Sequence, residues 1–238
     1  LYSFTLPACP VRKNVGKQSM EEVLGLQAFS LFRQKKIAIF FIFSMLLGVS
    51  LQITNGYATP FIDHFKEIAE YADSFGVKYP VVLYSVSQIS ETVCILFIPF
   101  FMKRYGIKQV MLSAMFAWTL RFAFLGLGNP GMPGILLFVL SMIVYGMAFD
   151  LFNISGSLYV DKTTNPEIRS SAQGLFMMMT NGFGASIGSL VAQFVVNSNT
   201  TDGSVEWTTV WATFSIYALL VGIAFALVFR PTPEENMV

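Results

Sequence analysis

Six long runs of apolar residues follow one another along the chain, separated by short polar segments with turn residues such as Gly128, Asn129 and Pro130. A helix rises about 1.5 Å per residue, so about 20 residues cross the hydrocarbon core of a bilayer. Because that core offers no water to backbone groups, we predict that each run forms a helix. The runs cover residues 37–62, 81–102, 108–127, 134–160, 171–196 and 208–229.

The composition agrees with a membrane protein. Of the 238 residues, 54% are hydrophobic and only 12% are charged, which is far from the average soluble domain. We therefore expect an all-α membrane protein with six transmembrane helices, surrounded by membrane lipid. The net charge of +1 gives no indication of a nucleic-acid partner.

Basic residues gather in alternate loops, with twelve on one side of the predicted bundle and two, Lys66 and Lys78, on the other. An excess of Lys and Arg marks cytoplasmic loops, so we predict that both ends of the chain are cytoplasmic. The twelve are Arg12, Lys13, Lys17, Arg33, Lys35, Lys36, Lys103, Arg104, Lys108, Lys162, Arg169 and Arg230.

The segments outside the bundle divide the chain into three parts. Residues 1–36 are interpreted as a cytoplasmic linker, residues 37–230 as the six-helix bundle and residues 231–238 as a cytoplasmic tail. The residues from Ser19 to Glu22 fit a helix capping box, and an amphipathic helix on the inner membrane surface is expected after them. The linker-like start without an initiating methionine is typical of the second half of a longer protein. The apolar positions of this helix would be Met20, Val23, Leu24, Ala28 and Leu31.

Polar residues inside the second run form a stripe. Positions i, i+3, i+4 and i+7 of a helix share one face, and the residues at this spacing are Tyr84, Ser87, Gln88 and Glu91. A carboxylate in the middle of a membrane helix costs roughly 2.5 kcal/mol or more, so Glu91 is expected to serve a function.

Two other runs carry polar residues at similar depth. Gln52 and Asn55 share a face of the first run; in the fourth, Asp150 shares a face with Asn153 and Ser157, and Tyr145 and Phe149 lie one turn apart beside them. These groups could line one cavity, or they could only hydrogen-bond neighbouring helices, at about 0.6 kcal/mol per bond. The second alternative is weaker for Glu91 and Asp150, which are the only acids inside the spans.

Arg121 is the one basic residue inside a span. It could be the counter-charge of these acids, extend toward the outer surface, or pair with Asp63.

Small residues cluster in the fifth run and form the pairs Gly184/Gly188 and Ala185/Ser189, with Gly182 beside them. Pairs four residues apart allow close approach of a neighbouring helix, so packing is expected here, with rocking of the bundle as a second interpretation.

Other chemistry is mostly excluded. The single histidine, His64, falls in a predicted outer loop after Pro60, so a Ser-His nucleophile or a histidine metal cluster is not expected in the membrane. Cys9 and Cys94 lie in a tail and an apolar run, and we expect single thiols. No cofactor, metal site or enzymatic activity is predicted.

Four blocks carry a resemblance: IAIFFIFSMLLGVSLQITNGYATPF, SQISETVCILFIPFFMKRYGIKQVM, LSMIVYGMAFDLFNISGS and PEIRSSAQGLFMMMTNGFG. They resemble the second half of bacterial nucleoside permeases of the nucleoside:proton symporter family, which belongs to the major facilitator superfamily. The RYGIK stretch is similar to a degenerate form of the superfamily's cytoplasmic loop motif. It departs from that motif at Met102 and Lys103, which replace the usual aspartate.

The resemblance implies the C-terminal half of a proton-coupled nucleoside transporter of the bacterial inner membrane, whose six-helix N-terminal half is absent from this chain. It also implies the substrate-binding residues, which coincide with the polar positions found from spacing. Glu91 and Asp150 are then the candidates for proton coupling, with Glu91 expected mainly on the ribose. The implied binding residues are Gln52, Asn55, Gln88, Glu91, Tyr145, Phe149 and Asp150.

The residues alone also agree with two other classes of protein, a channel and a membrane sensor. Six helices with both ends inside also describe a complete channel or a non-transporting membrane sensor, and polar stripes would line a pore equally well. A membrane-embedded enzyme is remote because no histidine is buried. Six further spans encoded upstream of Leu1 would favour the transporter.

Overall fold

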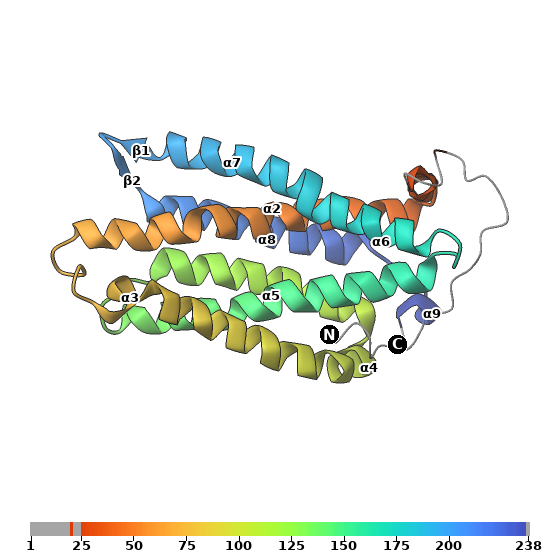
Figure 1. Cartoon of the computed structure of the whole chain (residues 1–238), viewed down its shortest axis with the longest axis horizontal. Helices are drawn as coiled ribbons and strands as arrows, with labels where there is room; N and C mark the ends of the chain where they lie inside the picture. Colours follow the sequence, from red (N-terminus) through yellow and green to blue (C-terminus); the bar gives the residue numbers. More distant parts are fainter. Residues whose placement is uncertain (1–19, 21–24, 237–238) are drawn as a thin grey trace, which may run out of the picture.

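The computed structural model describes residue 20 and residues 25–236. Long helices run side by side along the molecule (Figure 1). The main elements are η2 (Leu26–Arg33), α2 (Lys35–His64), η3 (Phe65–Glu67), α3 (Phe75–Lys78), α4 (Pro80–Leu127), α5 (Gly134–Thr163), α6 (Arg169–Met177), η4 (Met178–Gly184), α7 (Ala185–Ser198), α8 (Trp207–Val228) and α9 (Pro233–Asn236). Two-residue strands, β1 (Thr200–Thr201) and β2 (Ser204–Val205), pair antiparallel between α7 and α8.

Helix α4 is two membrane spans joined at Gly106. A straight helix of 48 residues would be about 72 Å long, more than twice the bilayer core. Gly106 interrupts it with φ 78° and ψ 168°, a backbone conformation that residues with a Cβ rarely adopt. The chain reverses there, as the olive and yellow-green parts of α4 show in Figure 1. We call residues 80–105 the first arm and residues 107–127 the second arm.

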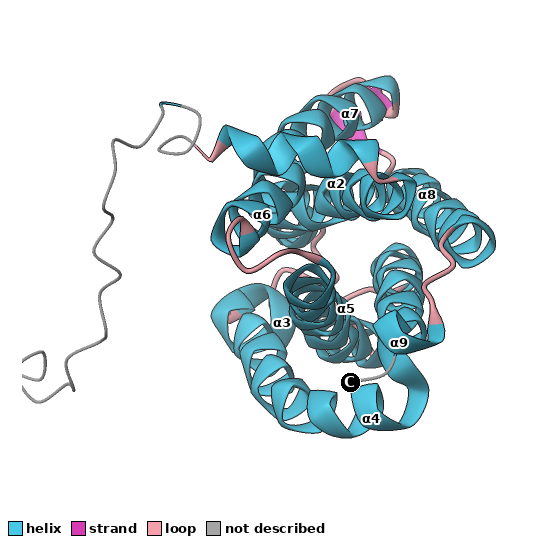
Figure 2. Cartoon of the chain, turned by 90° about the vertical axis from the view of Figure 1, so that its right-hand side faces the viewer, coloured by secondary structure: helices cyan, strands magenta, loops and turns pink. Residues whose placement is uncertain are grey.

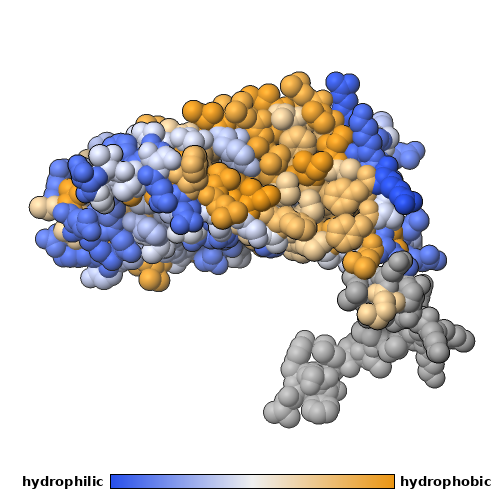
Figure 3. All heavy atoms as spheres, turned by 90° about the horizontal axis from the view of Figure 1, so that it is seen from above, coloured by the Kyte–Doolittle hydropathy of each residue, from blue (hydrophilic) through white to orange (hydrophobic). Residues whose placement is uncertain are grey.

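Five helical segments are long and apolar enough to cross a membrane, and the two arms of α4 raise the number of spans to six. The prediction of an all-α membrane protein with six spans is therefore confirmed. Apolar residues gather over much of the face that carries α7, with hydrophilic residues toward the ends (Figure 3). The chain is a multi-pass membrane protein.

The helices form two groups, seen end-on in Figure 2. One holds α2, α8 and the continuous span built from α6, η4 and α7; the other holds α5 and both arms of α4. The groups are tied together where Ser215 Oγ of α8 donates to the Thr119 carbonyl of the second arm, at 2.9 Å. Within the first group, Tyr217 Oη donates to the Leu46 carbonyl of α2 at 2.8 Å.

Glycines bring α2 close to the fifth span. A Cβ on Gly184 would lie 2.5 Å from the Met45 carbonyl oxygen, and one on Gly188 would lie 3.0 Å from Gln52 Cβ. The predicted packing role of this pair is confirmed. The pair Ala185/Ser189 does not share it, because Ala185 is only half-buried and Ser189 is exposed.

Two local expectations need correction. His64 is the last residue of α2 and not part of a loop, because Pro60 lies inside that helix without ending it. The expected amphipathic helix lies partly outside the described residues, which omit Ser19, Glu21 and Glu22. In its described part, η2 is a 3-10 helix that buries Ala28 and Leu31.

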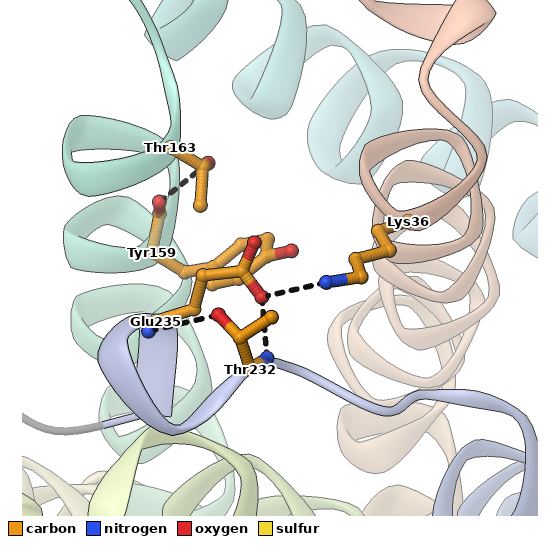
Figure 4. A network of polar contacts seen from close by, with 5 residues as sticks. All are labelled: Lys36, Tyr159, Thr163, Thr232 and Glu235. Carbon is orange, nitrogen blue, oxygen red and sulfur yellow. Dashed lines mark hydrogen bonds and ion pairs between the residues drawn. The ribbon is translucent and has the colours of Figure 1, made fainter.

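The C-terminal segment contacts the start of α2 and the turn between the arms of α4. Lys36 Nζ of α2 lies 3.3 Å from Glu235 Oε2, which also accepts a hydrogen bond from the Thr232 backbone at 2.6 Å (Figure 4). Next to it, Asn236 Oδ1 accepts from the Lys108 backbone N–H at 2.9 Å. The segment therefore bridges the start of α2 and the turn between the arms of α4.

Glu235→Gln tests this bridge. Partial burial alone would raise the pKa of Glu235, but hydrogen bonds from Thr232 and the charge of Lys36 lower it overall. A lowered pKa means that the ionised group stabilises the fold at neutral pH and that this contribution is lost as pH falls through the folded-state pKa. We expect a loss of about 1 kcal/mol or less, because the pair is partly exposed.

The measurement is the thermal midpoint in detergent at neutral and acidic pH. The neighbouring Glu234→Gln is the matched control, since Glu234 is exposed. A deficit of Glu235→Gln that persists unchanged in acid would contradict this role of the carboxylate.

Candidate functional site

The predicted stripe of the first arm is only partly available to a ligand. Ser87 is buried and donates to the Tyr84 carbonyl at 2.7 Å, so its hydroxyl is used within its own helix. Gln88 is exposed, and its Nε2 lies 3.4 Å from Glu91 Oε1. Tyr84 Oη is 2.9 Å from Thr59 Oγ1 of α2, which joins the first arm to that helix. Gln88 and Glu91 thus form a polar pair at the surface of the chain.

Helix α5 lies against the first arm beside this pair. Ser90 Oγ donates to the Ile143 carbonyl at 2.6 Å, and a Cβ on Gly146 would lie 2.6 Å from the Glu91 backbone nitrogen. This close approach brings Asp150, one turn beyond Gly146, within electrostatic range of Glu91. The two acids predicted as candidates therefore lie near each other.

Asp150 is the more enclosed of the two acids. Its side chain is 6% exposed, and its Oδ2 has no hydrogen-bond partner among the described residues. The buried thiol of Cys94 lies nearby on the first arm. A buried carboxyl oxygen without a partner is costly, which suits a group that binds a proton or a ligand atom.

Two aromatic rings precede Asp150 on α5. The rings of Tyr145 and Phe149 are stacked, with centroids 6.3 Å apart and an angle of 6° between their planes. Trp118 of the second arm presents its edge to Tyr145 at 5.8 Å and 90°. Stacked, nearly parallel rings can accept a flat ligand against a π face.

The other two predicted polar residues of α5, Asn153 and Ser157, form hydrogen bonds within α5 or with the neighbouring helix α6. Asn153 Nδ2 donates to the Phe149 carbonyl at 3.0 Å, within its own helix. Ser157 Oγ donates to Gln173 Oε1 of α6 at 3.1 Å, and Gln173 Nε2 donates back to the Ser157 carbonyl at 2.7 Å. For Ser157 the alternative of a bond between neighbouring helices is confirmed.

Helix α2 contributes Gln52 and Asn55. Gln52 is half-buried because its Cβ packs at Gly188, whereas Asn55 is exposed. A cavity of about 10 Å³ lies beside Phe149, between α2 and α5. It is far smaller than the roughly 300 Å³ or more of a site for a small molecule. A ligand of nucleoside size would have to bind on the open side of these residues.

All three predictions for Arg121 are wrong. It is fully buried, so it does not extend to the outer surface, and Asp63 pairs with Lys66 at 2.6 Å instead. None of the four ion pairs among the described residues includes Arg121, so it has no carboxylate as a direct partner. Its guanidinium contacts α5.

One feature of the site was missed. The middle of the fifth span is a π-helix, η4, which contains the exposed amide of Asn181. Such π-turns are frequent at functional sites. In the sequence, this position is marked only by two adjacent polar residues, Thr180 and Asn181, within an apolar run. The spacing of apolar residues does not distinguish a π-turn from an α-helix.

The described residues contain no group of three or more His, Cys, Asp or Glu side chains that could hold a metal ion. Six membrane spans with two neighbouring acids, exposed amides and a stacked aromatic pair define a multi-pass membrane protein with a polar candidate site. Comparison with known proteins identifies the family. A family model described as "Nucleoside H+ symporter" matches residues 1–234, and the chain belongs to this family.

Curated relatives agree. The chain is 51% identical over 230 residues to the nucleoside permease NupG of Escherichia coli (strain K12), covering 97% of this chain and 55% of that protein. It is 51% identical over 229 residues to the xanthosine permease of the same organism, covering 96% and 55%. These relatives are named as permeases and not as enzymes. The chain spans about half the length of the curated relatives it matches.

A solved structure has the same fold. The crystal structure of nucleoside transporter NupG superposes with a TM-score of 0.83 at 51% identity, over 97% of this chain and 57% of that one. A mutant of the same transporter gives a TM-score of 0.86, over 96% and 57%.

Proposed function

We propose that this chain is the C-terminal half of a nucleoside:proton symporter of the major facilitator superfamily, which takes up nucleosides across the bacterial inner membrane by alternating access. The observation that carries the proposal is the stacked pair Tyr145 and Phe149 beside the neighbouring acids Glu91 and Asp150. Membership of the nucleoside H+ symporter family supports it.

The chemistry of a nucleoside fits these groups. Its base is a flat ring system with polar edges, and its sugar carries vicinal hydroxyls, so it needs aromatic faces, amides and a hydroxyl acceptor. Tyr145 and Phe149 offer the faces. The exposed pair of Gln88 and Glu91 offers a donor and an acceptor, and Glu91 is assigned to the ribose. Gln52 and Asn55 add amides from α2.

Asp150 is assigned to the proton. Its enclosed carboxyl, with one oxygen lacking a partner, can take up a proton from water only when the site opens. The carboxyl of Glu91 on the first arm lies near it, so substrate bound at Glu91 and a proton bound at Asp150 share one local environment. Proton uptake at Asp150 is thereby linked to the state of the site.

A second six-helix half completes the transporter in this proposal. Gln88 and Asn55 are exposed, and the cavity beside Phe149 is too small to enclose a nucleoside. Both ends of the chain are assigned to the cytoplasm. Residues 1–36 then form the central linker, residues 37–230 the bundle and residues 231–238 the tail, with membrane lipid around the bundle.

The test is uptake of a labelled nucleoside by cells that express the two-half transporter and lack other nucleoside permeases. We expect accumulation above the external concentration that a protonophore abolishes. Equilibration without accumulation would indicate a channel, and no uptake would indicate a sensor; either result would overturn the proposal.

Replacing Gln88 with leucine tests recognition of the nucleoside. The substitution removes an exposed amide whose one side-chain bond is the 3.4 Å contact to Glu91. We expect weaker nucleoside binding by about 1–3 kcal/mol, the usual loss for a missing hydrogen-bond partner, and a similar loss for Asn55→Leu.

The measurement is the Kd in equilibrium binding to the purified transporter. Gln109→Leu is the matched control, since Gln109 is an exposed glutamine on the other arm of α4. Free nucleobases should compete poorly, and equal competition by base and nucleoside would contradict recognition of the sugar.

A further inference from the structure

Arg121 is a buried charge that the proposed function does not use. Its side chain is 1% exposed, in the middle of the second arm. Removing a guanidinium from water is expensive unless other groups compensate for its lost hydration. No carboxylate in the described part of the chain forms an ion pair with it. The compensation must come from the residues it touches.

These residues all lie on one turn of α5. Arg121 Nη1 donates to Ser141 Oγ at 3.0 Å and contacts Met142 Sδ at 3.2 Å. The guanidinium carbon lies 5.0 Å from the centre of the Tyr145 ring. A cation over an aromatic ring is attracted by the ring's electrons, and the attraction is stronger away from water.

The Tyr145 ring is therefore held by its neighbours. Arg121 lies over it, Trp118 meets it edge-on at 5.8 Å, and Phe149 stacks on it within 6° of parallel. No hydrogen bond of its hydroxyl occurs among those of the described residues, so these contacts set the ring's orientation. Trp118 and Arg121 come from the same turn of the second arm, three residues apart.

We propose that Arg121 is a positioning residue that fixes the Tyr145 ring in its stack with Phe149 and thereby sets the aromatic surface on which the base of the nucleoside binds. The inference rests on the proposed function for its ligand. Arg121 acts through Tyr145 and does not contact the nucleoside. A purely structural role, in which Arg121 only joins the second arm to α5, is the alternative that an experiment must separate.

Nucleoside binding to the two-half transporter separates them. We expect Arg121→Met to raise the Kd about tenfold or more and Arg121→Lys, which retains a cation, to restore part of the affinity. In a Tyr145→Leu background, Arg121→Met should raise the Kd less than twofold further, because the ring it positions is gone. Equal, independent losses in both backgrounds would overturn the proposal.

Arg104→Met is the matched control. Arg104 also lies over a tyrosine ring, that of Tyr105 at 5.7 Å, but both side chains are exposed at the inner end of the first arm. Its substitution should leave the Kd unchanged. A Kd increase equal to that of Arg121→Met would show that loss of any such cation weakens binding, and would overturn the proposal.

A measurement without ligand tests whether Arg121 positions the Tyr145 ring, independently of nucleoside binding. In protein labelled with 5-fluorotryptophan, the fluorine resonance of Trp118 is assigned by Trp118→Phe. Arg121→Met should shift it clearly more when Tyr145 is present than in Tyr145→Leu, while the resonances of Trp207 and Trp211 stay in place. An unmoved Trp118 resonance would overturn the positioning role even if nucleoside binding is intact. Failure of the unsubstituted transporter to bind nucleoside would instead overturn the proposed function, whatever the resonance shows.

Discussion

Glu91→Gln is expected to abolish nucleoside binding or to weaken it by about two orders of magnitude. Glu91 is half-buried next to the exposed Gln88, and its carboxylate can accept hydrogen bonds from two ribose hydroxyls at once. Hydrogen bonds to a charged group contribute about 1.5–3 kcal/mol each, so losing the charge costs more than losing Gln88. An amide in the same place keeps the shape, but it is uncharged and has one acceptor oxygen where the carboxylate has two.

The measurement is equilibrium binding to the purified two-half transporter, made together with pH-driven uptake. Glu67→Gln is the control, because Glu67 lies in η3, beyond the C-terminal end of α2, and is exposed. A 2′,3′-dideoxynucleoside should bind the unsubstituted protein and Glu91→Gln almost equally, since it lacks the hydroxyls. If binding in Glu91→Gln is intact while coupling is lost, the roles of the two acids are reversed.

The six helices could be predicted because the bilayer leaves few choices. Runs of about 20 apolar residues must form helices there, and each of the six runs lies largely within a helical span of the structure. Even the reversal inside α4 was expected between residues 102 and 108. Its reason was not: Gly106 takes a left-handed φ, and Asn236 lies over the turn.

Within the site, the spacing of polar residues predicted which of them share a helix face, but not which groups they contact. It grouped Ser87 with Gln88 and Glu91, although the Ser87 hydroxyl donates to the Tyr84 carbonyl of its own helix, a bond that Ser commonly makes in helices. It offered a carboxylate for Arg121, and the structure provides a hydroxyl, a thioether and an aromatic ring. The partners of Arg121 depend on how α5 packs against the second arm of α4, and helical periodicity carries no information on that.

The proximity of Glu91 to Asp150 also depends on packing. The sequence places these acids on different helices at similar depth, which leaves their separation undetermined. Gly146 decides it, because only a residue without a Cβ lets α5 lie against the backbone of Ser90 and Glu91. Two acids in one electrostatic environment can divide the binding of substrate and proton between them.

Asp150→Asn is expected to separate these two tasks. An asparagine fills the same enclosed space near Cys94 and can still donate to a nucleoside, but it cannot take up a proton. We therefore expect nucleoside binding within about tenfold of the unsubstituted transporter, and exchange of internal for external nucleoside to continue. Accumulation driven by a pH gradient should be lost, since the amide stays neutral at every stage of the transport cycle.

Three measurements on one preparation of proteoliposomes decide this prediction: nucleoside binding, exchange at equal pH, and uptake driven by an imposed pH gradient. Asp161→Asn is the matched control, because Asp161 lies near the C-terminal end of the same helix, where it is paired with Arg169 at 3.2 Å. It should change none of the three strongly. Gradient-driven accumulation by Asp150→Asn would exclude Asp150 as the coupling residue and leave Glu91 as the candidate. Loss of exchange together with binding would instead place Asp150 in the substrate site, where its unpartnered Oδ2 would accept a hydrogen bond from the nucleoside.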